Sequence, residues 1–85
     1  MFINKSADGK NNICGKQIMR LRKTLGISQR ELADRMQLAG LDIDKNAIQR
    51  IEAGKRFVTD IELCYFCTVL RVSVEKLLLL DGFQS

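Results

Sequence analysis

One local pattern limits what this chain can fold into, because it fixes the start of a helix. Ser28 and Glu31 form an S-x-x-E capping box, in which each side chain can satisfy a free amide of the first helical turn. Leu32 and Ala33 give this helix an apolar side, and Gly40 is placed to end it. The sequence therefore predicts a short amphipathic helix between Ser28 and Gly40.

The segment that follows predicts a second short helix with a polar outer side. Asp44 can cap it, since a carboxylate accepts hydrogen bonds from first-turn amides and faces the positive end of the helix. Ile48 and Ile51 recur at helical spacing and form its inward stripe. Four polar side chains are left on the outer side: Lys45, Asn46, Gln49 and Arg50. A short basic helix of this kind suits the major groove of DNA, so double-stranded DNA is the predicted ligand.

The remaining apolar residues predict three more helices around the same core. Periodic apolar residues favour a helix over about residues 15–25. A second capping box, Thr59 with Glu62, introduces a strongly apolar helix, and Ser73 can cap a short fifth one. With 85 residues, 46% apolar content and no proline, the chain is predicted to form one compact all-α domain of five helices.

The two ends of the chain are expected to differ. Residues 1–12 are polar and lack periodicity, which predicts a flexible arm before the domain over residues 13–85. Near the other end, Leu79, Leu80 and Phe83 add more apolar surface than a small core needs. These three residues are predicted to form a homodimer interface, with ordinary core packing as the open alternative.

The distribution of charge also favours a polyanionic partner. Residues 16–56 carry a net charge of +5, and the rest of the chain carries −1, which gives +4 in total. A solvated surface remains an alternative reading of this balance alone. No stretch is long enough for a signal core or a membrane span, and three cysteines are an odd number for a secreted disulfide scaffold, so we expect a cytoplasmic protein.

Other chemistry finds less support in the sequence. Cys64 and Cys67 form a C-x-x-C pair of the type that binds zinc or carries thiol redox chemistry. The chain has no histidine and Cys14 is distant in sequence, so small core residues are the favoured reading and no metal or cofactor is expected. Without histidine or a glycine-rich phosphate loop, and with Ser28 and Ser73 explained as caps, we expect no enzyme.

Taken together, these residues resemble the helix-turn-helix DNA-binding domains of phage repressors and Cro. The likeness extends from about Gly15 to Leu80. Its elements are Arg20-Leu21-Arg22, Leu25-Gly26-Ile27-Ser28-Gln29, Glu31-Leu32-Ala33, Ile48-Gln49-Arg50-Ile51-Glu52 with Gly54-Lys55, and Leu70-x-Val72-Ser73-Val74-x-x-Leu77-Leu78. The chain departs from the pattern between Ala33 and Ile48, which are 15 positions apart, a longer interval than usual in this family. We expect residues 37–43 to hold the surplus as an extra helical turn, with Leu41 and Ile43 against the core.

The resemblance implies a lambda-repressor-like bundle whose second and third helices form the helix-turn-helix, and it implies a role for each matching residue. The four outer residues of the third helix, Lys45, Asn46, Gln49 and Arg50, would face base edges in the major groove. Gln29, Lys55 and Arg56 would bind phosphates, and Gly54 would allow close approach of the DNA backbone. Arg22 and Glu52 would form a structural ion pair.

These expectations combine into a homodimeric transcriptional regulator that binds a palindromic operator, more plausibly as a repressor than as an activator. Two alternatives stay open. One is an antitoxin or anti-regulator whose main partner is another protein. The other, less favoured, is a regulator that responds to zinc or to thiol oxidation.

Overall fold

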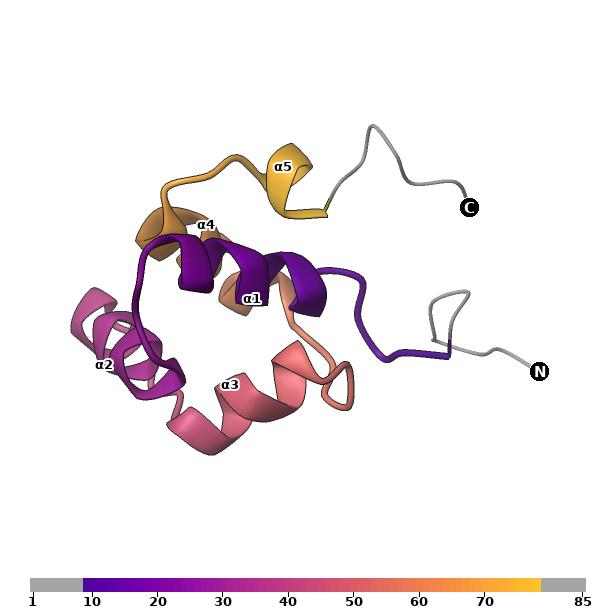
Figure 1. The fold of residues 1–85 in the computed structure, drawn as a ribbon, viewed down its shortest axis with the longest axis horizontal. Coiled ribbons are helices and arrows are strands. Elements are labelled where there is room, and N and C mark those ends of the chain that lie inside the picture. Colours follow the sequence, from indigo (N-terminus) through magenta and orange to yellow (C-terminus); the bar gives the residue numbers. More distant parts are fainter. Residues whose placement is uncertain (1–8, 79–85) are drawn as a thin grey trace.

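The computed structural model describes residues 9–78, and this part of the chain contains five α-helices and no strand. The helices are α1 (Gly15–Thr24), α2 (Gln29–Ala39), α3 (Lys45–Glu52), α4 (Asp60–Leu70) and α5 (Val74–Leu78). In Figure 1, α1 crosses the front of the molecule, α3 lies along the bottom and α5 along the top. The predicted all-helical fold is confirmed. Leu79, Leu80 and Phe83 lie outside the described residues, so the expected dimer interface remains a prediction.

Four predicted caps start the helices, because each accepts a hydrogen bond from a first-turn amide. These residues are Ser28, Asp44, Thr59 and Ser73. Thr59 and Glu62 form the complete capping box, in which Thr59 Oγ1 accepts from Glu62 N–H at 3.1 Å and Glu62 Oε1 accepts from Thr59 N–H at 3.0 Å. At Ser28 one of the two capping-box bonds forms: Ser28 Oγ accepts a hydrogen bond from Glu31 N–H at 3.0 Å. Local hydrogen bonding thus accounts for where these four helices begin.

A single apolar core lies between the helices, and all five contribute to it. Its fully buried large side chains are Ile18, Leu32, Met36, Ile48, Ile51, Phe66 and Leu77. Helix α3 packs against both α1 and α2. Its inner side is held by Ile48 and Ile51, each 0% exposed, as the sequence pattern predicts. Burial of these two side chains fixes which face of α3 points to solvent.

The surplus residues between α2 and α3 are arranged in two parts. Residues 37–39 continue α2, and Gly40, at φ +116°, ends it in the left-handed region that favours glycine. Beyond Gly40 the link to α3 is not helical, so the expected extra helical turn ends before Leu41. Ile43 is 4% exposed and Leu41 packs partly against the core, as expected. The lengthened turn is therefore anchored to the core.

Of the arm expected over residues 1–12, residues 1–8 lie outside the described part of the chain, and residues 10–12 make hydrogen bonds to the rest of the domain. From residue 9 the chain is described, and it lies beside the segment that follows α3 (Figure 1). Asn11 N–H donates a hydrogen bond to Gly54 O at 2.9 Å. The physical reason is that carbonyl groups of the turn after α3 need donors, and this segment supplies them.

Candidate DNA interface

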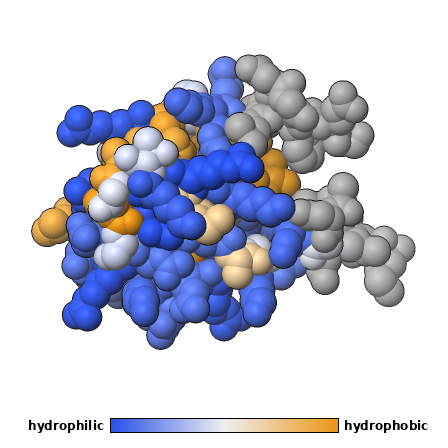
Figure 2. Space-filling model, in the orientation of Figure 1, coloured by the Kyte–Doolittle hydropathy of each residue, from blue (hydrophilic) through white to orange (hydrophobic). Residues whose placement is uncertain are grey.

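The outward face of α3 carries the four side chains that sequence analysis assigns to base recognition. All four are exposed: Lys45, Asn46, Gln49 and Arg50. Figure 2 shows that the surface at the bottom of the molecule, where α3 lies in Figure 1, is hydrophilic. Such a row of donors on a short exposed helix can reach the donor and acceptor groups that base pairs present in the major groove.

A buried ion pair holds the inner side of α3 in place. Arg22 Nε lies 2.8 Å from Glu52 Oε2, and a second guanidinium nitrogen donates to Glu52 Oε1 at 3.1 Å. Their side chains are only 11% and 3% exposed. Arg22 also donates to Ile27 O at 2.9 Å. This network joins α1, the loop before α2 and the end of α3, and the hydrogen bond to Glu52 raises the pKa of Arg22 above its ordinary value.

Gln29 extends the same network to the first residue of α2. Its Nε2 donates to Glu52 Oε1 at 3.0 Å. The resemblance assigns Gln29 to a phosphate, and the two roles are compatible because an amide nitrogen carries two N–H groups. One N–H can orient the side chain on Glu52 while the other is offered to DNA. The carboxylate of Glu52 is therefore occupied by Arg22 and Gln29, which is the arrangement of a structural group.

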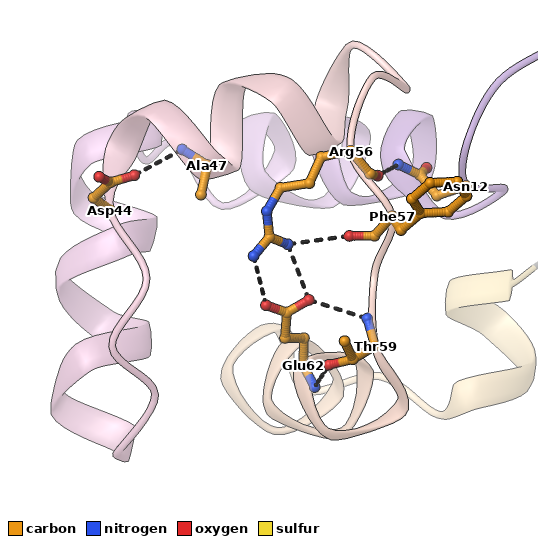
Figure 3. Close-up of polar contacts among 7 residues, drawn as sticks. All are labelled: Asn12, Asp44, Ala47, Arg56, Phe57, Thr59 and Glu62. Atoms are coloured by element: carbon orange, nitrogen blue, oxygen red, sulfur yellow. Dashed lines mark hydrogen bonds and ion pairs between the residues drawn. The ribbon is translucent and has the colours of Figure 1, made fainter.

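Arg56, the third expected phosphate contact, makes bonds within the domain. Its guanidinium makes two hydrogen bonds to the Glu62 carboxylate, at 2.9 and 2.8 Å, and one to Phe57 O at 3.1 Å (Figure 3). Glu62 is at the same time the second member of the α4 capping box. These contacts lower the pKa of Glu62 and raise that of Arg56. Arg56 thus fastens the loop after α3 to the start of α4.

Lys55 remains exposed beside this fastened loop. Lys55 N–H donates to Arg50 O at 2.9 Å, and Gly54 N–H donates to Ile51 O at 2.9 Å, which closes the last turn of α3. Gly54 is buried and has φ +76°, a backbone conformation that favours glycine, which explains why glycine occupies this position after α3. The turn leaves Lys55 as the cation next to α3 that is available for a phosphate.

Two of the cysteines, Cys14 and Cys67, lie in surroundings that favour the protonated thiol. Cys14 is buried in the core, and burial raises its pKa to about 11. Burial also raises the pKa of Cys67, whereas Cys64 is exposed. A raised pKa reduces the thiolate population, the species that attacks oxidants and binds metals. Over residues 9–78, no group of three or more histidine, cysteine, aspartate or glutamate side chains is placed to hold a metal ion.

Sequence reasoning missed two features of this region. The ion pair between Arg56 and Glu62 was not predicted, because Glu62 was assigned to the capping box alone. Glu62 in fact makes both sets of contacts. The contacts of Asn11 and Asn12 with the end of α3 were missed because side-chain bonds to backbone carbonyls leave no periodic pattern. The Asn-Asn pair two residues before the predicted start of a helix was the available signal.

The fold and its exposed polar third helix define a helix-turn-helix DNA-binding domain. The chain matches the family model of the helix-turn-helix domain over residues 15–80, and it belongs to that family. It is also similar to the crystal structure of the restriction-modification controller protein C.AhdI from Aeromonas hydrophila, with 25% identity and a TM-score of 0.66. This match covers 75% of the present chain and 86% of the other. No curated protein matches the chain.

The protein is therefore a DNA-binding transcriptional regulator of the helix-turn-helix class. Within residues 9–78, none of the helices has the length and apolar character needed to cross a membrane.

Proposed function

We propose that the protein is a homodimeric transcriptional repressor that binds a palindromic operator and needs no cofactor or enzymatic activity. The observation that carries the proposal is the polar outer face of α3, held from behind by the Arg22–Glu52 pair. Similarity to a controller protein supports a role in controlling transcription. A domain of this kind can repress by occupying DNA that polymerase needs.

The exposed residues of α3 can divide the reading of bases among them. Arg50 can donate two hydrogen bonds to a guanine, and Asn46 can pair in the same way with an adenine. Lys45 and Gln49 reach bases or nearby phosphates from the same face. Each good two-bond contact contributes about 1–3 kcal/mol of discrimination against a wrong base.

Phosphate contacts would fix the register of α3 in the groove. Lys55, directly after α3, and Gln29, at the start of α2, are proposed for this role. Arg56 is left out of this proposal because three of the five N–H groups of its guanidinium are engaged by Glu62 and Phe57 O. Two copies related by a two-fold axis would place their third helices about 34–36 Å apart, one turn of DNA. Leu79, Leu80 and Phe83 are the residues proposed for that dimer contact.

The first test is selection of bound duplexes from a random DNA pool at physiological salt, with and without EDTA. We expect an enriched palindrome that binds at least about 10³-fold more tightly than scrambled DNA, and no effect of EDTA. Weak, salt-sensitive binding without enrichment would contradict sequence-specific recognition and would favour a protein partner, as in an antitoxin. An effect of EDTA or of thiol oxidants would favour the zinc or redox alternative.

A point substitution then tests the assignment of base readers. Arg50→Ala should lose about 1–3 kcal/mol of binding to the selected operator and relax preference at one base pair of each half-site. Arg35→Ala is the matched control, because Arg35 is an exposed arginine that lines the groove between α2 and the end of α4. Equal losses on selected and scrambled DNA would show that Arg50 is not a base reader.

A further inference from the structure

The end of α3 is held by three consecutive residues from the beginning of the described chain. Helix α3 has only eight residues, and a helix leaves its last four carbonyl groups without helical partners. Lys10, Asn11 and Asn12, here called the N-terminal strap, donate to carbonyls at and after this end. The bonds run from Lys10 Nζ to Ala53 O (3.4 Å), Asn11 N to Gly54 O (2.9 Å), Asn11 Nδ2 to Lys55 O (3.1 Å), and Asn12 Nδ2 to Ile51 O (3.1 Å) and Arg56 O (2.8 Å).

Asn12 is the centre of this arrangement because both ends of its amide are used. Its Nδ2 donates to Ile51 O, in the last turn of α3, and to Arg56 O, in the next loop (Figure 3 shows the second bond). Its Oδ1 accepts from Gly15 N–H at 2.7 Å, in the first turn of α1. One side chain therefore joins the start of α1, the end of α3 and the loop that Arg56 fastens to α4.

The surrounding packing leaves little room for this end of α3 to move. A Cβ atom at Gly15 would collide with the carbonyl oxygen of Ile51, so α1 begins directly against the end of α3. A Cβ atom at Gly54 would lie 2.5 Å from Cδ of Lys10. The Lys10 ammonium group also sits by Ala53 O, at the negative end of the α3 dipole. The strap thus packs closely against the turn that follows α3.

We propose that the N-terminal strap supports the base-reading face of α3, and that Asn12 is a positioning residue for Gln49 and Arg50. The inference rests on the proposed function. Ile51, whose carbonyl Asn12 holds, directly follows Arg50 in the chain. A guanidinium must be aimed at two acceptors at once to distinguish a guanine, so release of this helix end weakens discrimination more than general attraction to DNA.

Two substitutions of Asn12 separate this role from simple capping of α1. Asn12→Asp keeps an oxygen for Gly15 N–H but loses both donors and sets a carboxylate against Ile51 O and Arg56 O. Asn12→Ala loses all three bonds. The readout is the ratio of dissociation constants for scrambled and selected DNA. We expect both variants to lower this ratio about tenfold or more, the scale of one base contact.

Ser73→Ala is the matched control. It removes one cap bond, from Lys76 N–H to Ser73 Oγ at 3.1 Å, at the start of α5. It should lower the melting temperature without changing the ratio. A second readout needs no DNA: the amides of Ala53, Gly54 and Lys55, which close the last turn of α3, should exchange hydrogen faster in both Asn12 variants and not in the control.

The outcomes distinguish this inference from the proposed function. A lower ratio of dissociation constants in both Asn12 variants, with faster amide hydrogen exchange at the end of α3, supports a positioning role. A wild-type ratio in Asn12→Asp, or an equal loss of affinity for both DNAs, would overturn it while leaving sequence-specific binding intact. A wild-type chain that prefers no sequence would instead overturn the proposed function, and the inference with it.

Discussion

Two arginine–glutamate pairs within residues 9–78 share one bidentate chemistry but differ in burial and in what they connect. Arg22 and Glu52 have side chains 11% and 3% exposed, and they join α1 to α3 through the core side of the interface. Arg56 and Glu62 are 33% and 12% exposed, and they join a loop to the start of α4. The same N···O distance, 2.8 Å, therefore occurs in two different solvent surroundings.

The difference shows why geometry alone does not rank such pairs. A buried charge cannot recover its hydration when its partner is removed, so loss of one member is costly even where the pair itself adds little net stability. A pair with an accessible arginine can be rehydrated, and much of its contribution then comes from the other bonds its members make. For Glu62 these are the capping-box bonds with Thr59.

The largest effect is expected from breaking the buried pair. Glu52→Ala leaves Arg22 with no carboxylate in a buried position, and it should lower the free energy of unfolding by about 3–5 kcal/mol. Urea denaturation followed by circular dichroism measures this. Asp34→Ala is the control, because Asp34 is exposed and lies beyond the first turn of α2, and it should change stability by about 0.5 kcal/mol or less.

A double substitution sharpens this result. Replacing both partners, as Arg22→Met with Glu52→Leu, should recover much of the stability that Glu52→Ala loses, because no charge is then left unpaired. It should still impair DNA binding, since Gln29 loses its acceptor on Glu52. If Glu52→Ala lowered the free energy of unfolding by less than about 1 kcal/mol, Arg22 would be hydrated in the variant. The contrast between the two pairs would then disappear.

The second pair should give a smaller loss. Glu62→Ala removes half of the α4 capping box and releases Arg56, with an expected cost of about 1–2 kcal/mol. The same urea titration measures it. Glu62→Gln should lose less, because an amide oxygen can still accept from Thr59 N–H. A cost for Glu62→Ala as large as that for Glu52→Ala would mean that exposure does not separate the two pairs.

Sequence reasoning predicted the features that local patterns encode. Capping side chains mark where α2, α3 and α4 begin, and the spacing of Ile48 and Ile51 gives the inner face of α3. These signals depend on residues within one helical turn of each other, so they can be read without the fold. The outward placement of the four proposed base readers follows from the same spacing.

Features that depend on tertiary hydrogen bonds could not be read in this way. Arg56 was assigned to phosphate because an arginine after a basic helix has that role by analogy, whereas its partner Glu62 is known only once the loop is placed. The strap was read as a flexible arm because Asn12 has neither apolar character nor periodic neighbours. The pairing of Arg22 with Glu52, 30 residues apart, came from family resemblance alone.

The different availability of Lys55 and Arg56 leads to a prediction about DNA binding. Lys55→Ala should lower the slope of log affinity against log salt by about one, equally for selected and scrambled DNA, and leave stability unchanged. Arg56→Ala should instead lower stability by about 1 kcal/mol or less, which is less than for Glu62→Ala because Thr59 and Glu62 keep their capping-box bonds, and it should leave the salt slope unchanged. Fluorescence anisotropy at several salt concentrations measures both slopes. A reduced slope for Arg56→Ala would restore it as a phosphate contact.

The smallest expected effect is a pH dependence of the Arg56–Glu62 pair. Its contacts with Arg56 and Thr59 hold the pKa of Glu62 below the ordinary value of 4.5 in the folded state. The unfolded chain therefore binds more protons at this site, so its stabilisation is fully present above pH 4.5 and is lost as the pH falls through the folded value. Between about pH 5 and about pH 3, Glu62→Gln should lose less stability than the wild type, whereas Glu31→Gln should match it. Parallel loss in all three proteins would show that Glu62 gains nothing from ionisation in the folded domain, and the pair would then act mainly by shape and capping.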